Sequence, residues 1–226
     1  MGVNLIPKIS GFRVRNENFS QTNGSVRRGC INAGQHKVMW FNLHLHNIGD
    51  TDFHIGRPED RPDVFTNMPG IGLVFKEKFY TWRLTDDYGK EIKNGFKVAF
   101  CIMDFNPPFR YDCADQGVSI GNHDEYNANL PCQFLEIDNL PDGKYTFHVT
   151  CNSYSVQQVK NGQKPLFEED NYEDNTASVQ LQFAGDNDPV PVGGDTSAKV
   201  AEVQAGDSKR SSIKEEYENK IMSESK

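Results

Sequence analysis

Residues 38–46 read VMWFNLHLH, and this stretch decides the fold class. Large apolar side chains occupy every second position from 39 to 45. The positions between them, from 40 to 46, carry Trp, Asn and two His. A period of two residues is that of a β-strand with one buried face. The same alternation recurs at residues 145–151 and 177–183, so we expect a protein built from half-buried strands.

Turn residues separate these apolar stretches. Asp86-Asp87-Tyr88-Gly89 follows the aromatic-rich run 73–84 and precedes the apolar run 96–103, and Pro141-Asp142-Gly143-Lys144 stands between residues 134–137 and 145–151. Both turns predict β-hairpins, and the second does so more clearly because its Pro presets φ and its Gly accepts positive φ. No helical period is sustained before residue 185. The sequence therefore predicts an all-β fold, an antiparallel β-sandwich.

Composition divides the chain into three expected parts. Residues 1–28 form an N-terminal arm, residues 29–184 the sandwich domain, and residues 185–226 a flexible C-terminal tail. Residues 185–211 contain almost no large apolar side chain, which is typical of a linker.

The tail is predicted to end in a short amphipathic helix. Ser212 and Glu215 form a capping box, and Ile213, Tyr217 and Ile221 repeat every four residues. A segment of about ten residues is too short to be stable alone. We expect the three apolar side chains to bind a partner protein rather than the parent domain.

Charge and cysteine content narrow the function classes. The formal net charge is -8 and no run of basic residues occurs, which argues against nucleic acid as a partner. The first 20 residues contain no apolar run of signal-peptide length, and no stretch is apolar enough to span a membrane. Five cysteines without a C-x-x-C pair suggest reduced thiols and an intracellular, cytoplasmic protein.

Five stretches between residues 29 and 185 carry a resemblance to a known family. In order they are GCINAGQHKVMWFNLHLHNIGDTDFHIGRP (29–58), GFKVAFCIMD (95–104), QGVSIGNHDEY (116–126), LPCQFLEIDNLPDGKYTFHVTCN (130–152) and NYEDNTASVQLQFAG (171–185). Together they resemble the lysyl oxidase family in its bacterial, viral and animal forms. The resemblance covers about two-thirds of the chain.

The resemblance implies a copper amine oxidase whose lysine tyrosylquinone cofactor forms from a Lys and a Tyr of its own chain. Those residues match Lys97 and Tyr126. The three copper histidines of the family match Gly70, Gly72 and Val74, which offer no ligand atom. We therefore expect no copper and no cofactor, with Lys97 and Tyr126 as vestigial, ordinary side chains.

The resemblance also bears on the cysteines, because secreted members hold this region with disulfides. Cys101, Cys113 and Cys132 remain, whereas Pro69 and Asn122 stand where two partner cysteines would be. This favours five free thiols.

Three functions stay open. The leading one is a non-catalytic structural or interaction protein, a pseudoenzyme within a larger protein assembly; a minor capsid protein in the virion of a large DNA virus is one candidate. The second is an amine oxidase with a relocated copper site at His44, His46 and His54. The third is a small-ligand or glycan-binding sandwich that uses exposed aromatic residues. These are Trp82, Phe105, Phe109 and Tyr111.

Overall fold

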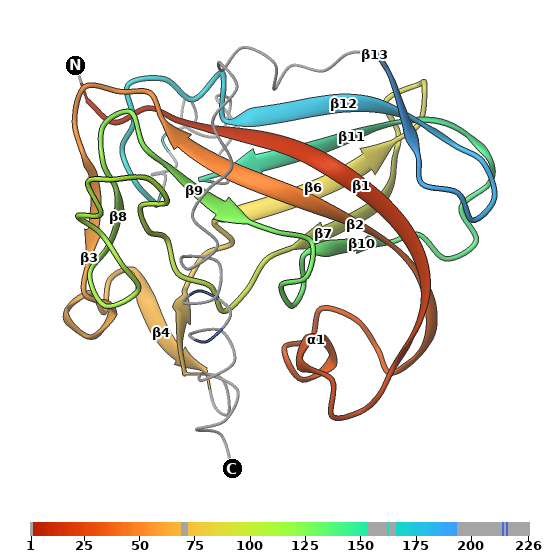
Figure 1. Ribbon diagram of the computed structural model, residues 1–226, viewed down its shortest axis with the longest axis horizontal. Helices are drawn as coiled ribbons and strands as arrows, with labels where there is room; N and C mark the ends of the chain where they lie inside the picture. The colour runs from red at the N-terminus through yellow and green to blue at the C-terminus, as the bar shows by residue number, and fades with distance from the viewer. Residues whose placement is uncertain are drawn as a thin grey trace.

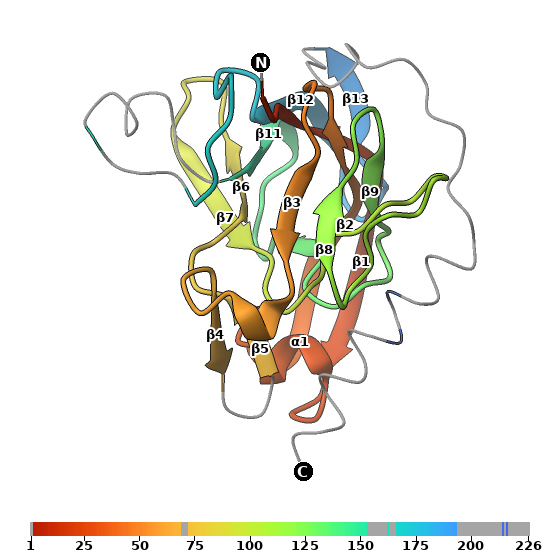
Figure 2. The ribbon, with the colours of Figure 1, turned by 90° about the vertical axis from the view of Figure 1, so that its left-hand side faces the viewer.

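Two antiparallel sheets face each other across one apolar core (Figures 1 and 2). The computed structural model describes residues 2–68, 72–152, 162, 166–193, 214 and 216. The first sheet has the order β1 (Leu5–Phe19), β2 (Gly34–Asn47) and β10 (Phe134–Glu136), and β9 (His123–Tyr126) also pairs with β2. The second has the order β13 (Val190–Gly193), β12 (Thr176–Phe183), β11 (Gly143–Cys151), β6 (Tyr80–Thr85) and β7 (Glu91–Phe96).

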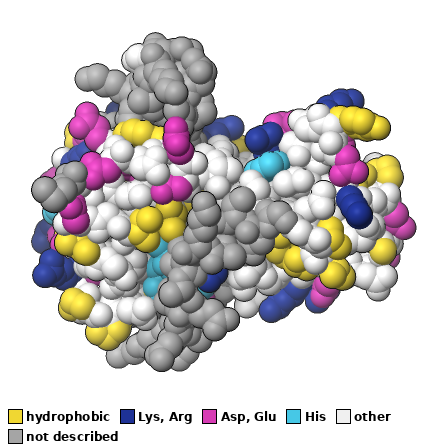
Figure 3. All heavy atoms as spheres, turned by 90° about the horizontal axis from the view of Figure 1, so that it is seen from above, with side chains coloured by type: hydrophobic (Ala, Val, Ile, Leu, Met, Phe, Trp, Pro, Cys, Tyr) yellow, Lys and Arg dark blue, Asp and Glu magenta, His cyan; other side chains and the backbone are white. Residues whose placement is uncertain are grey.

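Smaller elements cover the ends of the sandwich. Two strand pairs are β3 (Phe53–Gly56) with β8 (Gln116–Val118), and β4 (Phe65–Met68) with β5 (Gly72–Phe75). Among residues 2–193, as far as they are described, the helices are α1 (Gly24–Arg27) and the 3-10 helix η1 (Pro58–Asp60). Within the described ranges, no helix is long and apolar enough to cross a membrane. One face of the molecule mixes acidic, basic and apolar side chains, with histidines surfacing at separate places (Figure 3).

The core confirms the predicted sandwich. The apolar side chains of β2 at positions 39, 41, 43 and 45 are fully buried. The Phe41 ring lies 5.1 Å from the Trp82 ring of β6 and 4.9 Å from the Phe147 ring of β11. These edge-to-face contacts join the two sheets, as aromatic pairs commonly do in cores.

The expected N-terminal arm is wrong, because most of it is a strand of the sandwich. β1 pairs with β2 along its whole length, from Leu5 opposite Asn47 to Phe19 opposite Gly34. Leu5, Ile9 and Val14 are buried in the core. The apolar side chains of β1 are spread over 15 residues, and they still form one strand. A register shift after Ser10 interrupts the alternation of apolar and polar side chains from which a strand is normally predicted.

The two expected hairpins differ in outcome. The Asp86 turn joins β6 to β7 in an antiparallel hairpin, but the second strand is Glu91–Phe96 rather than the run 96–103. The turn at Pro141 does not close a hairpin. It connects β10, which pairs with β2, to β11, which pairs with β6 and β12, so it carries the chain from one sheet to the other.

The start of the predicted linker also belongs to the domain. β13 pairs with β12, and the backbone N–H of Val14 donates to the Asp188 carboxylate over 2.8 Å. Further along the tail, Lys214 and Glu216 have α-helical backbone, in keeping with the expected helix. Ile213, Tyr217 and Ile221 lie outside the described residues.

The expectation of five reduced thiols is wrong. Disulfides join Cys30 to Cys132 and Cys101 to Cys113, with Cα–Cα separations of 5.7 and 5.2 Å, inside the range that a disulfide spans. Cys151 is a free, buried thiol, and burial raises its pKa well above the usual value. The odd cysteine count thus reflects two bridges and one core thiol.

Candidate functional site

Lys97 and Tyr126 are brought together in the core. Lys97 directly follows β7, and its backbone N–H donates to the Tyr80 carbonyl over 3.2 Å. Tyr126 ends β9. Both side chains are at most 1% exposed, and the Lys97 Nζ lies 5.0 Å from the centre of the Tyr126 ring. The two residues that the resemblance assigns to the cofactor are therefore neighbours, although 29 positions separate them in the chain.

Tyr126 is held as a neutral phenol. Its hydroxyl donates to the Cys101 carbonyl over 2.9 Å, and its ring packs against Tyr80 and Phe100 at centroid distances of 5.3 and 5.7 Å. Burial, followed by the negative charge of Asp124, raises the pKa of Tyr126 well above its usual value.

A second ammonium group reaches the same ring from the C-terminal tail. The Nζ of Lys214 lies 3.5 Å from the centre of the Tyr126 ring and 5.6 Å from that of Phe105. It forms an ion pair with Asp124 and donates to the Glu125 carbonyl over 3.2 Å. Lys214 thus contacts its own domain, whereas the partner contact expected of Ile213, Tyr217 and Ile221 falls on residues outside the described ranges.

The Lys214–Asp124 pair is almost completely shielded from water, with 1% and 0% of the two side chains exposed. Burial raises the pKa of Asp124, and the Lys214 ammonium opposes that effect. A buried charge needs its partner, because water cannot replace it. The sequence analysis missed both residues, since nothing near position 214 indicates a contact 90 residues away.

The positions matched to the copper histidines do not fit a copper ion. Gly72 and Val74 belong to β5, and Val74 packs in an apolar cluster with Ala99 and Met68. Gly70 lies outside the described residues. Gly72 has a φ of 102°, a backbone conformation that residues with a Cβ rarely adopt. Histidine at this position would strain the strand, so the local backbone suits glycine and not an imidazole ligand.

Two of the three histidines proposed for a relocated site are together, and the third is elsewhere. His44 and His46 share a face of β2, with ring centroids 6.2 Å apart. His54 stacks on Tyr111 and bonds to Asp115 over 2.8 Å. Instead, His123 of β9 joins the pair, at 5.5 Å from His44 and 5.1 Å from His46.

All three of these imidazoles are neutral near pH 7. Burial is the largest cause, and neighbouring positive charge adds to it. The pKa of His44 falls to about 4, that of His46 to about 3 and that of His123 to about 4.

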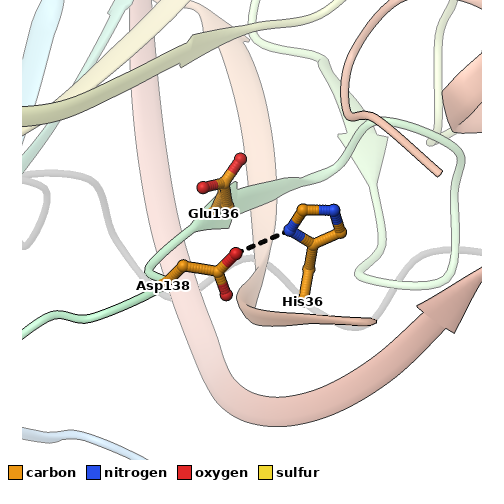
Figure 4. A group of neighbouring side chains, drawn as sticks. All are labelled: His36, Glu136 and Asp138. Carbon is orange, nitrogen blue, oxygen red and sulfur yellow. Dashed lines mark hydrogen bonds and ion pairs between the residues drawn. The ribbon is translucent and has the colours of Figure 1, made fainter. Parts of the chain in front are cut away.

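Another group of possible metal ligands lies between β2 and the end of β10. In His36, Glu136 and Asp138, one donor atom of each lies within 4.8 Å of the others, and Figure 4 shows the His36 ring facing the Asp138 carboxylate with Glu136 beside them. Each donor side chain is already engaged, however. His36 bonds to Asp138 over 2.6 Å, and Glu136 lies 3.6 Å from the Lys93 ammonium. This arrangement is a partly exposed ion-pair network.

The aromatic residues considered for glycan binding are not an exposed set. Trp82 and Phe105 are 2% and 1% exposed, in the core. Phe109 is exposed, and Tyr111 stacks on His54. The expectation is therefore wrong for the first two residues.

Comparison with known proteins identifies the family of this chain. The lysyl oxidase family profile matches residues 15–190, and the chain therefore belongs to the lysyl oxidase family. It is 30% identical over 129 residues to human lysyl oxidase homolog 4, covering 54% of this chain and 17% of that protein. It is 26% identical over 137 residues to chicken lysyl oxidase homolog 2, covering 57% and 17%.

The chain thus spans less than a fifth of these two curated relatives. A crystal structure of a CARDB domain from Pyrococcus furiosus covers 78% of this chain and 88% of its own at 10% identity. Its TM-score of 0.27 is too low to carry an argument.

Proposed function

We propose that this lysyl oxidase-like domain is non-catalytic and serves as a structural or interaction protein in a larger protein assembly. The observation that carries the proposal is the backbone at Gly72, whose φ of 102° suits glycine at a position matched to a copper ligand. The apolar surroundings of Val74 add to it. A copper site needs nitrogen or sulfur donors in a fixed geometry.

The occupied face of Tyr126 is a second support. The Lys214 ammonium lies 3.5 Å from the ring centre, so a side chain of the same chain already covers this face of the ring. Burial of that ammonium with Asp124 makes the contact part of the folded domain.

The interaction role is supported by exposed apolar side chains on neighbouring loops. Ile48, Phe109 and Ile120 are each at least 44% exposed. Asp52 ties their loops together, since its carboxylate accepts from the Ile120 N–H and from the Arg110 guanidinium. Clustered exposed apolar residues commonly mark protein contacts. We propose other protein subunits as partners, with a virus particle as one candidate assembly.

A copper-loading experiment tests the catalytic half of this proposal. Tag-free protein is incubated with Cu²⁺ and dialysed, and then analysed for quinone absorption, for peroxide release from a primary amine, and by intact mass. We expect no quinone, no peroxide and no Lys97–Tyr126 crosslink. A crosslinked peptide, or peroxide release that Tyr126→Phe abolishes, would refute the proposal.

Native co-purification tests the interaction half. The double variant Ile48→Asp/Ile120→Asp should lose the partners that wild-type protein retains. Tyr88→Asp is the matched control, because Tyr88 is 96% exposed on the β6–β7 turn. Equal retention by all three proteins would remove the loop surface from the proposal.

A further inference from the structure

His44, His46 and His123 line one face of the β2–β9 pair. In the strand register His46 stands opposite His123, and His44 stands opposite Glu125. The three rings are nearly parallel, with interplanar angles of 16–24°. Residues at i and i+2 of a strand share a face with their cross-strand partners, so the backbone presents three imidazoles and one carboxylate to a common space.

Two of these imidazoles have an unsatisfied nitrogen. The Nε2 atoms of His46 and His123 are buried and have no hydrogen-bond partner among the described residues. The residues themselves are 4% and 1% exposed. Buried polar atoms in native proteins are almost always bonded, and an exception calls for an explanation such as an ion.

We propose that His44, His46 and His123 form a transition-metal site of the zinc class, with Glu125 as the fourth ligand. Three imidazole nitrogens and one carboxylate are a donor set that suits Zn²⁺ at about 2.0–2.2 Å. Glu125 has an oxygen 3.9 Å from the His44 Nε2. The neutral rings are in the form that binds metal, since an imidazole must offer a lone pair.

Metal binding requires a small rearrangement of side chains. Unlike the His36 group, the three rings do not place a nitrogen each within 4.8 Å of one another, so rotation about the side-chain torsions has to bring them together. The tautomer of His123 depends on the orientation of the Asn106 amide. The amide nitrogen lies 3.4 Å from the Nδ1 of His123, so a metal on Nε2 requires the amide to turn over and accept from Nδ1–H with its oxygen.

The surrounding charges are mixed. Lys8, which stands opposite His44 in the β1–β2 register, and Lys214 both add positive charge near the rings, whereas Glu125 and Asp104 add negative charge. Imidazole nitrogens favour transition metals over Mg²⁺ or Ca²⁺. We therefore expect selective zinc binding without a measurable response to Mg²⁺.

The site is separate from the Lys97–Tyr126 pair. Successive residues of β9 point to opposite faces, so His123 and Glu125 lie on one side while Asp124 and Tyr126 lie on the other. The inference therefore does not depend on the proposed function, and a bound metal there need not produce oxidase activity.

Zinc titration of the tag-free full-length chain tests the inference. We expect one equivalent by calorimetry, visible absorption bands of tetrahedral Co²⁺ with cobalt, and zinc-induced shifts of three histidine side chains in nitrogen-15 spectra of the wild-type protein. His46→Gln and His123→Gln should each weaken binding at least tenfold. His54→Gln and His148→Gln are matched controls and should bind as wild type.

The outcomes separate the explanations. Absence of saturable zinc binding would overturn the inference, as would zinc-induced shifts confined to His36, which would place the ion at the His36 group. The spectra use wild-type protein, so the test stands even where a buried-histidine variant fails to fold. If zinc binds as expected but copper loading also yields peroxide, the metal site stands and the non-catalytic function fails.

Discussion

Replacement of Lys214 by Met removes one charge of the buried ion pair and keeps most of the side-chain length. The Asp124 carboxylate, 0% exposed, would then be left without its cation. Breaking a buried pair in this way costs roughly 3–5 kcal/mol. For a domain of this size, about 2–4 °C per kcal/mol gives a fall in melting temperature of roughly 6–20 °C.

The loss should depend on pH in a defined direction. Burial already raises the pKa of Asp124, and removing Lys214 should raise it further. Above the unfolded-state pKa of about 3.9, the unfolded chain then releases a proton that the folded variant keeps, so folding is increasingly disfavoured as pH rises. We expect the difference between variant and wild type to be small near pH 3 and to grow towards pH 7.

Urea unfolding of the full-length chain at several pH values measures both effects. Lys90→Met is the matched control, because Lys90 is exposed and its loss should change the free energy of unfolding by less than about 0.5 kcal/mol. Adding Asp124→Asn to Lys214→Met should restore much of the stability, since no buried charge remains. Unchanged unfolding of Lys214→Met would refute the reasoning and return the tail to the role of a partner-binding tether.

Two further predictions concern other buried groups. Burial raises the pKa of Glu169 to about 7, so the folded state keeps a proton that the unfolded state loses above about pH 4.3. The free energy of unfolding should therefore fall by about 3 kcal/mol between about pH 4.3 and about pH 7. In urea unfolding, Glu169→Gln should flatten this dependence on pH, and an unchanged dependence would exclude Glu169 as its cause. Alkylation of unfolded, unreduced protein should label Cys151 alone, and labelling of all five cysteines would contradict the bridges. Reduction of the Cys30–Cys132 bridge, whose ends are 102 residues apart, should lower the free energy of unfolding by roughly 4–5 kcal/mol.

The alternation at residues 38–46 predicted β2 because burial on one face acts on each residue locally. The same reasoning failed for β10, whose partner is set by distant residues. Phe134 lies opposite Trp40 in the register, with the rings 4.8 Å apart. A turn sequence such as Pro141–Lys144 specifies that the chain reverses, but it does not specify whether the next strand joins the same sheet.

In the candidate site, too, some residues could be found from their neighbours in the sequence and others only from contacts between distant segments. Lys97 and Tyr126 could be found through motif order, since both lie in stretches that resemble the family. Lys214 could not, because its contact with Asp124 depends on how the tail returns to the domain. His123 was overlooked for the same reason, since only the β2–β9 register places it opposite His46.

The presence of Lys97 and Tyr126 does not by itself indicate amine oxidase activity, because both side chains are also buried in the core. Tyr126 is fully buried, packs against two aromatic rings and donates a hydrogen bond to Cys101; truncating such a residue costs roughly 3–5 kcal/mol whether or not a cofactor forms. A position whose only role is to bind metal has no such second constraint. Gly72 stands where the resemblance places a copper histidine, and its φ of 102° means that a histidine there would need a change of backbone as well as of side chain. For the proposal that this domain is non-catalytic, the backbone at Gly72 therefore counts for more than the presence of the Lys97–Tyr126 pair counts against it.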